Sequence, residues 1–238
     1  MNFLLSLFAA LVLIEFASAQ TWYFVTFTTP AGSYISSYTG SFVAPTLPQA
    51  ATYYLWPGLQ PRDNAGVLQP VLDGRSGTWW IGDGWCCSNP SLPWGSGFNG
   101  TGSCVNAIRK TDWKHPIEVA NGKTVQFGLK VNSIQNGTWA TTLSSSGGGS
   151  ATGTFPLPTH PMNQAIMAIE LYDVAWTFGQ FAFSNVVIVA NTTSTAWCTN
   201  GPTNYQNAAV VSKSTPVATV SGGQTTCTIA SIVLVRPA

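Results

Sequence analysis

The sequence predicts an all-β fold in which two antiparallel sheets pack face to face as a β-sandwich. Alternating apolar and polar residues recur between turns rich in Gly, Pro, Asn and Ser, and no segment keeps the 3.6-residue period of an amphipathic helix. Of the 238 residues, 45% are hydrophobic and only 7% are charged. A disordered chain has the opposite composition, and the length fits one sandwich domain.

Eight segments show the strand pattern clearly. In the segment 124–131, Val125, Phe127 and Leu129 alternate with polar residues, and the Asn136-Gly137 pair that follows is typical of a hairpin turn. The run 144–150 is expected to be a flexible loop. The strands are expected at 22–28, 51–56, 66–72, 78–81, 124–131, 138–143, 164–172 and 181–189, with two or three short ones after residue 192 that end in 229–235.

The first nineteen residues resemble a secretory signal peptide. An apolar run, 3–14, precedes Ala17-Ser18-Ala19, a small-x-small pattern that predicts cleavage before Gln20. No later stretch reaches the roughly 18 apolar residues that a spanning helix needs. We therefore expect 20–238 to be a single secreted, extracellular β-sandwich domain without a membrane anchor.

The cysteines and sequons fit an extracellular protein. In an oxidising compartment most of the five cysteines should pair: we favour Cys198 with Cys227, and Cys104 with either Cys86 or Cys87, which leaves one thiol over. Asn-x-Ser/Thr sequons predict glycosylation at Asn99, Asn136 and Asn191. The chain has no CxxC pair, and its two His residues are not spaced for zinc, so no metal or cofactor is expected.

The charge balance excludes one class of partner. Nine Lys and Arg against eight Asp and Glu give a net charge of +1. A chain without a basic field lacks the phosphate neutralisation on which nucleic-acid binding depends, so no nucleic-acid partner is expected. With so few carboxylates whose protonation could disrupt ion pairs, we expect an acid-tolerant monomer.

The scarcity of carboxylates makes Glu170 conspicuous. It interrupts the most apolar expected strand, in which Ile166, Ala168, Glu170 and Tyr172 would share one face. A carboxylate there lies either on a solvated sheet face or in a cleft. In a partly dry cleft its pKa would rise, which would make it a candidate acid or base.

Gln69 is the second unusual polar residue, because it lies in the middle of the expected strand 66–72. It would share a face with Val67, Val71 and Asp73. Its amide would either bond to a neighbouring strand or donate to a developing oxyanion, as such groups do in acyl transfer.

The order of several motifs resembles the eqolisin family, the glutamic peptidases. The matching stretches are Tyr54-Leu55-Trp56-Pro57-Gly58-Leu59-Gln60, Val67-Leu68-Gln69-Pro70-Val71-Leu72-Asp73, Thr78-Trp79-Trp80-Ile81, the segment 165–172 and Phe181-Ala182-Phe183-Ser184-Asn185-Val186. This likeness implies a concanavalin A-like (jelly-roll) sandwich, a secreted fungal origin, and hydrolysis of a polypeptide substrate.

By the same resemblance, Gln69 and Glu170 would form the catalytic pair. Glu170 would act as general base on water and then protonate the leaving amine, while Gln69 would hold the water and stabilise the oxyanion. Trp56, Trp79 and Trp80 would lie at the substrate, and Asp73 would orient Gln69. The chain departs from the family at Ile166, where members carry a second Glu, and near Ile81, where their Trp-rich strand carries an acid for which Asp83 is the possible substitute.

A second hypothesis is a carbohydrate-binding or carbohydrate-active sandwich with an extracellular glycan as partner. The chain has 10 Trp, and Trp79, Trp80, Trp85 and Trp94 surround a Gly/Ser/Asn-rich segment. Aromatic faces stack on sugar rings, although Trp side chains also fill the space between sheets. A glycosidase needs two facing carboxylates, and only Glu170 is a strong candidate.

Overall fold

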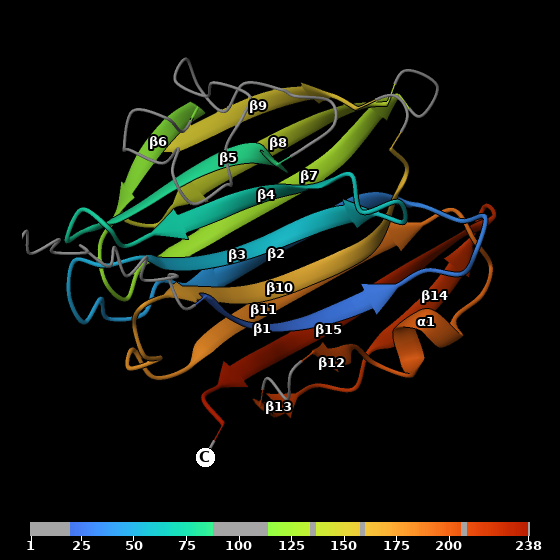
Figure 1. The fold of residues 1–238 in the computed structure, drawn as a ribbon. Helices are drawn as coiled ribbons and strands as arrows, with labels where there is room; N and C mark the ends of the chain where they lie inside the picture. Colours follow the sequence, from blue (N-terminus) through green and yellow to red (C-terminus); the bar gives the residue numbers. More distant parts are fainter. Residues whose placement is uncertain (1–19, 88–113, 134–136, 158–159, 206–208, 238) are drawn as a thin grey trace, which may run out of the picture.

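The chain folds into two antiparallel β-sheets packed face to face (Figure 1). The computed structural model describes residues 20–87, 114–133, 137–157, 160–205 and 209–237. The first sheet has seven strands in the order β12-β1-β10-β3-β4-β5-β6, and the second has the order β13-β15-β11-β2-β7-β8-β9, with β14 paired to β15. The predicted two-sheet sandwich is confirmed.

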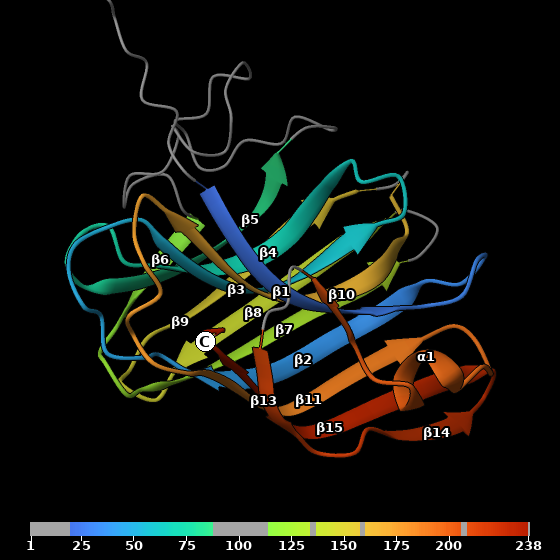
Figure 2. The ribbon, with the colours of Figure 1, turned by 60° about the horizontal axis from the view of Figure 1, so that its bottom comes forward.

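The elements of the seven-stranded sheet are β1 (Gln20–Thr28), β3 (Tyr53–Pro61), β4 (Gly66–Asp73), β5 (Trp79–Cys87), β6 (Lys114–Val119), β10 (Met162–Tyr172) and β12 (Thr203–Tyr205). Those of the other sheet are β2 (Ile35–Val43), β7 (Thr124–Ser133), β8 (Thr138–Ser145), β9 (Ser150–Pro156), β11 (Phe181–Ala190), β13 (Ala209–Lys213), β14 (Val217–Ser221) and β15 (Gln224–Val235). One short helix, α1 (Ala196–Thr199), lies beside the end of the second sheet (Figures 1 and 2).

The main core fills the space between the sheets. Strand alternation places every second residue there, so Val125, Phe127 and Leu129 of β7 are buried in it as predicted. On the other sheet, Met167 and Ile169 of β10 face the same core. The residues that alternate with these point to the outer face of each sheet. Glu170 is one of them, so it lies on the outer face of the seven-stranded sheet.

The disulfide between Cys198 and Cys227 is confirmed, with the two Cα atoms 5.6 Å apart. It joins α1 to β15, and both cysteines are fully buried. Cys86 on β5 is disulfide-bonded as well. Its expected partner Cys104 lies outside the described residues, as do the predicted signal peptide at 1–19, Trp94, Asn99 and Asn136.

Some strands differ from those predicted. β2, β6 and β9 were not expected, and 144–150 is no loop but the end of β8, a tight turn and the first residue of β9. β2 was not predicted because Ser, Thr and Gly occupy much of it, so its apolar and polar residues do not alternate clearly. Its pairing with β11 also shifts register twice. Among the described residues, no helix has the length and apolarity that a bilayer crossing requires.

Candidate functional site

A second apolar cluster covers the outer face of the seven-stranded sheet. We call it the outer cluster; its members are Tyr54, Trp56, Val71, Ile166, Ala168 and Tyr172. It is separate from the core between the sheets, and it comes from the central strands β3, β4 and β10. The outer face of a sheet is ordinarily polar and solvated, but here it is apolar and largely buried. The polar residues of this face are surrounded by the outer cluster.

Glu170 lies in the middle of this face with 5% of its surface exposed. Its carboxylate accepts three hydrogen bonds. Trp56 Nε1 donates to Oε2 at 3.2 Å, Gln20 Nε2 donates to Oε1 at 2.8 Å, and the Tyr172 hydroxyl also donates to Oε1. A carboxylate has about four acceptor positions, so one remains for a water or a substrate group, on Oε2.

Burial and hydrogen bonding act in opposite directions on Glu170. Loss of hydration raises the pKa of its carboxyl, and the hydrogen bonds from Tyr172, Trp56 and Gln20 lower it, with a net rise above the ordinary value. Burial is also the main cause that raises the pKa of the Tyr172 and Tyr54 hydroxyls. Both phenols therefore stay protonated and able to donate wherever Glu170 is ionised.

Gln69 lies on the same outer face, with 6% of its surface exposed. The neighbouring Val71 belongs to the outer cluster and Leu68 to the main core, which fixes the direction in which Gln69 points. Its buried Oε1 has no hydrogen-bond partner. Because amide O and N are assigned from hydrogen bonding, the buried end can equally present its N–H₂. An unpaired buried amide is costly, and a bound water or substrate group would satisfy it.

The strand register sets Gln69 and Glu170 apart. Glu170 pairs with Tyr54 on β3, and Tyr54 pairs with Asp73 on β4, four residues beyond Gln69. Ideal strand spacing gives an offset of about 13 Å along the strands and about 10 Å across two of them. The two side chains share a face, but this offset is longer than one water molecule bridges, so a group that contacts both must come from a substrate that spans the distance between them.

Trp56 lies between these two residues. Its Nε1 contacts Glu170, and the far edge of its ring, at Cζ3, lies 3.1 Å from the place that a Cβ on Gly58 would occupy. The Cβ of Gln69 lies 3.2 Å from that same place. The indole therefore extends from the carboxylate to Gln69, and only glycine at position 58 leaves room for it.

The structure corrects the role expected of Asp73. Its carboxylate accepts hydrogen bonds from Arg75, with Nη2 to Oδ2 at 2.6 Å and Nε to Oδ1 at 3.0 Å. The Arg75 guanidinium in turn lies over the Tyr54 ring, 5.4 Å from its centroid. Asp73 is four strand residues from Gln69, beyond hydrogen-bond reach, so it holds Arg75 and does not orient Gln69.

The two adjacent tryptophans of β5 point to opposite faces. Trp79 is 1% exposed in the core between the sheets, where its Nε1 donates to the Pro45 carbonyl at 2.7 Å. The expectation that it contacts substrate is therefore wrong. Trp80 lies half-buried on the other face, paired with Asp73 in the β-ladder, and this leaves it on the side of Glu170.

Asp83 does not replace the missing acid of the Trp-rich strand. It lies on the inward side of β5, is 2% exposed, and accepts a hydrogen bond from the Thr141 hydroxyl of the opposite sheet. Ile166, at the position where members of the eqolisin family carry a second Glu, belongs to the outer cluster. Among the described residues of β10, Glu170 is the one acid.

Three site residues were missed at the sequence level. Tyr172 could have been found, because it shares a strand face with Glu170 at a spacing of two. Gly58 carried a signal in the Trp-x-Gly spacing. Gln20 carried none, because its contact with Glu170 depends on the pairing of β1 with β10, which are about 150 residues apart in sequence.

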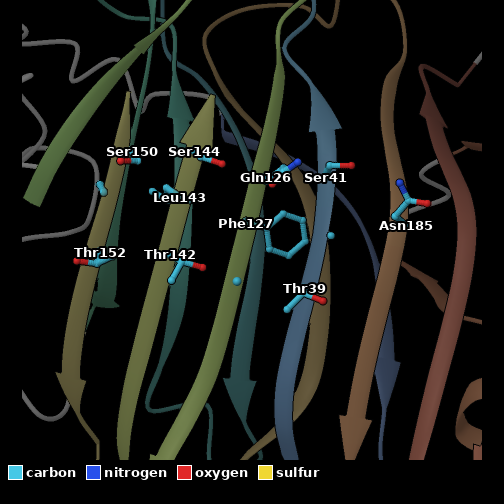
Figure 3. A pocket seen from close by; sticks show the side chains of 13 residues that line it. Thr39, Ser41, Gln126, Phe127, Thr142, Leu143, Ser144, Ser150, Thr152 and Asn185 are labelled. Carbon is cyan, nitrogen blue, oxygen red and sulfur yellow. The ribbon is translucent and has the colours of Figure 1, made fainter. Parts of the chain in front are cut away.

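The outer face of the other sheet carries a different surface. Figure 3 shows polar side chains spread over β9, β8, β7, β2 and β11, around a hollow of about 480 Å³. Its polar lining is formed by hydroxyl and amide groups of Thr39, Ser41, Gln126, Thr142, Ser144, Ser150, Thr152 and Asn185. None of the residues that line it is charged.

Tryptophan exposure bears on the glycan hypothesis. Of the eight Trp that the structure describes, six are buried: Trp56, Trp79, Trp85, Trp139, Trp176 and Trp197. They fill the core or the outer cluster and offer no open stacking face. The part of the chain that the structure covers holds no group of three or more His, Cys, Asp or Glu residues that could bind a metal ion.

The fold matches solved structures of glutamic peptidases. Scytalido-glutamic peptidase with a peptide-based transition state analogue is similar at a TM-score of 0.52 and 13% identity, over 90% of this chain and 100% of that one. SCP-B, a member of the eqolisin family of peptidases in complex with the tripeptide Ala-Ile-His, gives 0.50 and 14% over the same shares. No protein-family model matches the sequence, and no curated protein matches it significantly. The chain therefore shares the sandwich fold of the eqolisin structures.

Proposed function

We propose that this protein is an acid peptidase that cleaves polypeptides on the outer face of its seven-stranded sheet, with Glu170 as the general base and acid. One observation carries the proposal: the buried carboxylate of Glu170, held by three donors, lies on the same face as the Gln69 amide, whose buried Oε1 has no hydrogen-bond partner. The fold shared with glutamic peptidases supports the reaction type. A secreted location, which the sequence predicts, belongs to the same proposal.

The chemistry follows from the free positions of the two groups. The open acceptor position on Oε2 of Glu170 takes a proton from a water molecule, which attacks the scissile carbonyl. The Gln69 amide donates to the oxyanion that develops on the carbonyl oxygen. Glu170 then returns the proton to the leaving amine, and the C–N bond breaks. The net rise in the pKa of Glu170 suits a group that must both take up and release a proton.

The offset between the two groups fixes where the substrate lies. Both can act on one peptide bond only if that bond lies over the indole of Trp56, between them. Trp80 lies half-buried on the same face and offers a flank for an apolar substrate side chain.

The test uses the fact that residues 20–238 contain only two glutamates, Glu118 and Glu170. Glu170→Gln should abolish the cleavage of unfolded casein at a pH just above the Glu170 midpoint, where the wild-type carboxylate is ionised, because the amide cannot take up the proton. Glu118→Gln, at an exposed position on β6, is the matched control and should leave cleavage unchanged. Cleavage that survives Glu170→Gln would refute the assignment.

A second candidate function is glycan binding at the hollow shown in Figure 3. Its uncharged hydroxyl and amide lining matches the hydrogen-bonding groups of a sugar. It ranks below the peptidase because none of the described Trp residues lines it. Screening the protein against a glycan array tests this function, and Gln126→Ala should reduce any binding found.

A further inference from the structure

Gln20 is the first residue of β1, and its side-chain amide contacts both Glu170 and Tyr172. Its Nε2 donates both to Oε1 of Glu170 and to the hydroxyl of Tyr172, which itself donates to the same Oε1. The amide therefore closes a ring of three polar groups. Gln20 is exposed, whereas Glu170 and Tyr172 are buried, so the solvent side of this ring is formed by Gln20.

The strand pairing explains why Gln20 reaches this position. Trp22 lies directly opposite Glu170 on β10, and Gln20 lies opposite Tyr172. Gln20 and Glu170 are thus diagonal neighbours on one face, a distance that long side chains span. Trp56 donates to the other oxygen, Oε2. The hydrogen bonds from Gln20 and Tyr172 on Oε1 and the one from the indole on Oε2 therefore fix the carboxylate from two sides.

We propose that Gln20 is a positioning residue of the Glu170 site, which holds the carboxylate ionised and turned so that Oε2 faces the substrate. The inference rests on the proposed function for its effect on catalysis, whereas its effect on the carboxylate stands by itself. A hydrogen bond to an ionised carboxylate favours the ionised form, so Gln20 offsets part of the burial that disfavours it.

Other charged and titratable groups near Glu170 are few. Tyr172 on its own strand and Tyr54 across on β3 are phenols whose pKa values lie above the ordinary one. Asp73 on β4 is bound to Arg75, which neutralises it. β1 contributes no charged side chain, because its sequence is QTWYFVTFT. Cleavage before Gln20, which the sequence predicts, would place an α-amino group at this residue, and that group would be present in the wild type and in every Gln20 variant alike.

The experiment is a carboxyl titration by NMR on the protein with its glutamates ¹³C-labelled at the side-chain carboxyl. Glu118 serves as the internal reference, since it is exposed. Gln20→Leu, which keeps the bulk and removes the donor, should move the Glu170 midpoint upward by about one pH unit. Gln20→Lys, which adds a cation at similar length, should move it downward.

A control at the opposite end of the strand separates this effect from general damage to β1. Thr28 is exposed like Gln20, so Thr28→Ala should leave the Glu170 midpoint where it is. A midpoint that stays fixed in both Gln20 variants, or that moves the same way in both, would overturn the proposal. Shifts of opposite sign are not expected from a change in packing alone.

The titration and the peptidase assay fail independently. A protein that cleaves no peptide but shows the two opposite shifts refutes the proposed function and keeps the role of Gln20. A protein that cleaves peptides, but whose Glu170 midpoint is unchanged in both Gln20 variants, keeps the proposed function and refutes the role of Gln20. If it is active, the acid limb of its pH–rate profile should move upward in Gln20→Leu together with the NMR midpoint.

Discussion

Trp56 Nε1 donates a hydrogen bond to Glu170 Oε2 at 3.2 Å, and both groups are buried on the outer face of a sheet. The contact joins neighbouring strands β3 and β10 at a point where the sheet would otherwise meet water. The hydrogen bond holds Oε2, and Oε2 is also the carboxylate oxygen that has a free acceptor position. The indole thus has two tasks, since it orients the proposed base and forms the floor on which a substrate would lie.

Replacing Trp56 by Phe tests the first of these tasks. The ring remains as a floor, but the N–H donor is lost, and hydrogen bonds to charged groups contribute about 1.5–3 kcal/mol. We expect kcat/KM for a peptide substrate to fall about tenfold to a hundredfold. Trp176→Phe is the control, because its Nε1 donates to the Gly179 carbonyl and its ring lies in the main core, away from Glu170. Equal losses in the two variants would contradict a special role for Trp56.

Gly58→Ala tests the packing between Trp56 and Gln69. A Cβ there would lie 2.8 Å from Val67 Cγ1 and 3.1 Å from the Trp56 ring. Overpacking costs about 1–3 kcal/mol, more than the roughly 0.5–1 kcal/mol that alanine gains over glycine in a strand. Urea unfolding should show a net loss of stability, and peptide cleavage should fall as the ring is displaced. Gly147→Ala in an exposed turn should change neither quantity.

The rise in the pKa of Glu170 makes a prediction for stability against pH. A carboxyl whose pKa is higher in the folded than in the unfolded state favours folding at low pH. That contribution is complete below the unfolded pKa and is lost as pH rises through the folded pKa. The free energy of unfolding should therefore fall from acid toward neutral pH in the wild type. Glu170→Gln should flatten this fall, whereas Glu118→Gln should not.

The Cys198–Cys227 disulfide closes a loop with a sequence separation of 29. Chain-entropy arguments give it about 3–4 kcal/mol. Replacing both cysteines by serine should lower the free energy of unfolding, measured by urea titration, by that amount. Because the bridge joins α1 to β15, away from the outer cluster, the NMR midpoint of Glu170 should stay unchanged. A shifted midpoint would mean that the bridge supports the site.

The sequence predicted the sandwich and the proposed base for one physical reason. Strand alternation is local, so it assigned Glu170 and Tyr172 to one face and identified the carboxylate as an intrusion in an apolar strand. Alternation failed where both positions carried the same residue type: Trp79 and Trp80 are adjacent, and no local rule says which of them faces the core. It failed again for β2, whose Ser, Thr and Gly residues blur the pattern.

The partners of the site residues were beyond local reasoning. Whether Asp73 serves Gln69 or Arg75 depends on side-chain length and on a four-residue spacing that strand geometry stretches to about 13 Å. The contact of Gln20 with Glu170 requires the register of two strands from opposite ends of the chain. Such pairings arise from the packing of the whole sheet, so only the folded structure reveals them.

The most direct test of the account compares two midpoints in the wild-type protein. One is the titration of the Glu170 carboxyl, observed by NMR against Glu118, and the other is the acid limb of kcat/KM for peptide cleavage. If Glu170 is the base that takes the proton from water, the two midpoints coincide and lie above the ordinary value of a glutamate. Cleavage whose acid limb lies away from the Glu170 midpoint, or that persists in Glu170→Gln, would contradict the central claim.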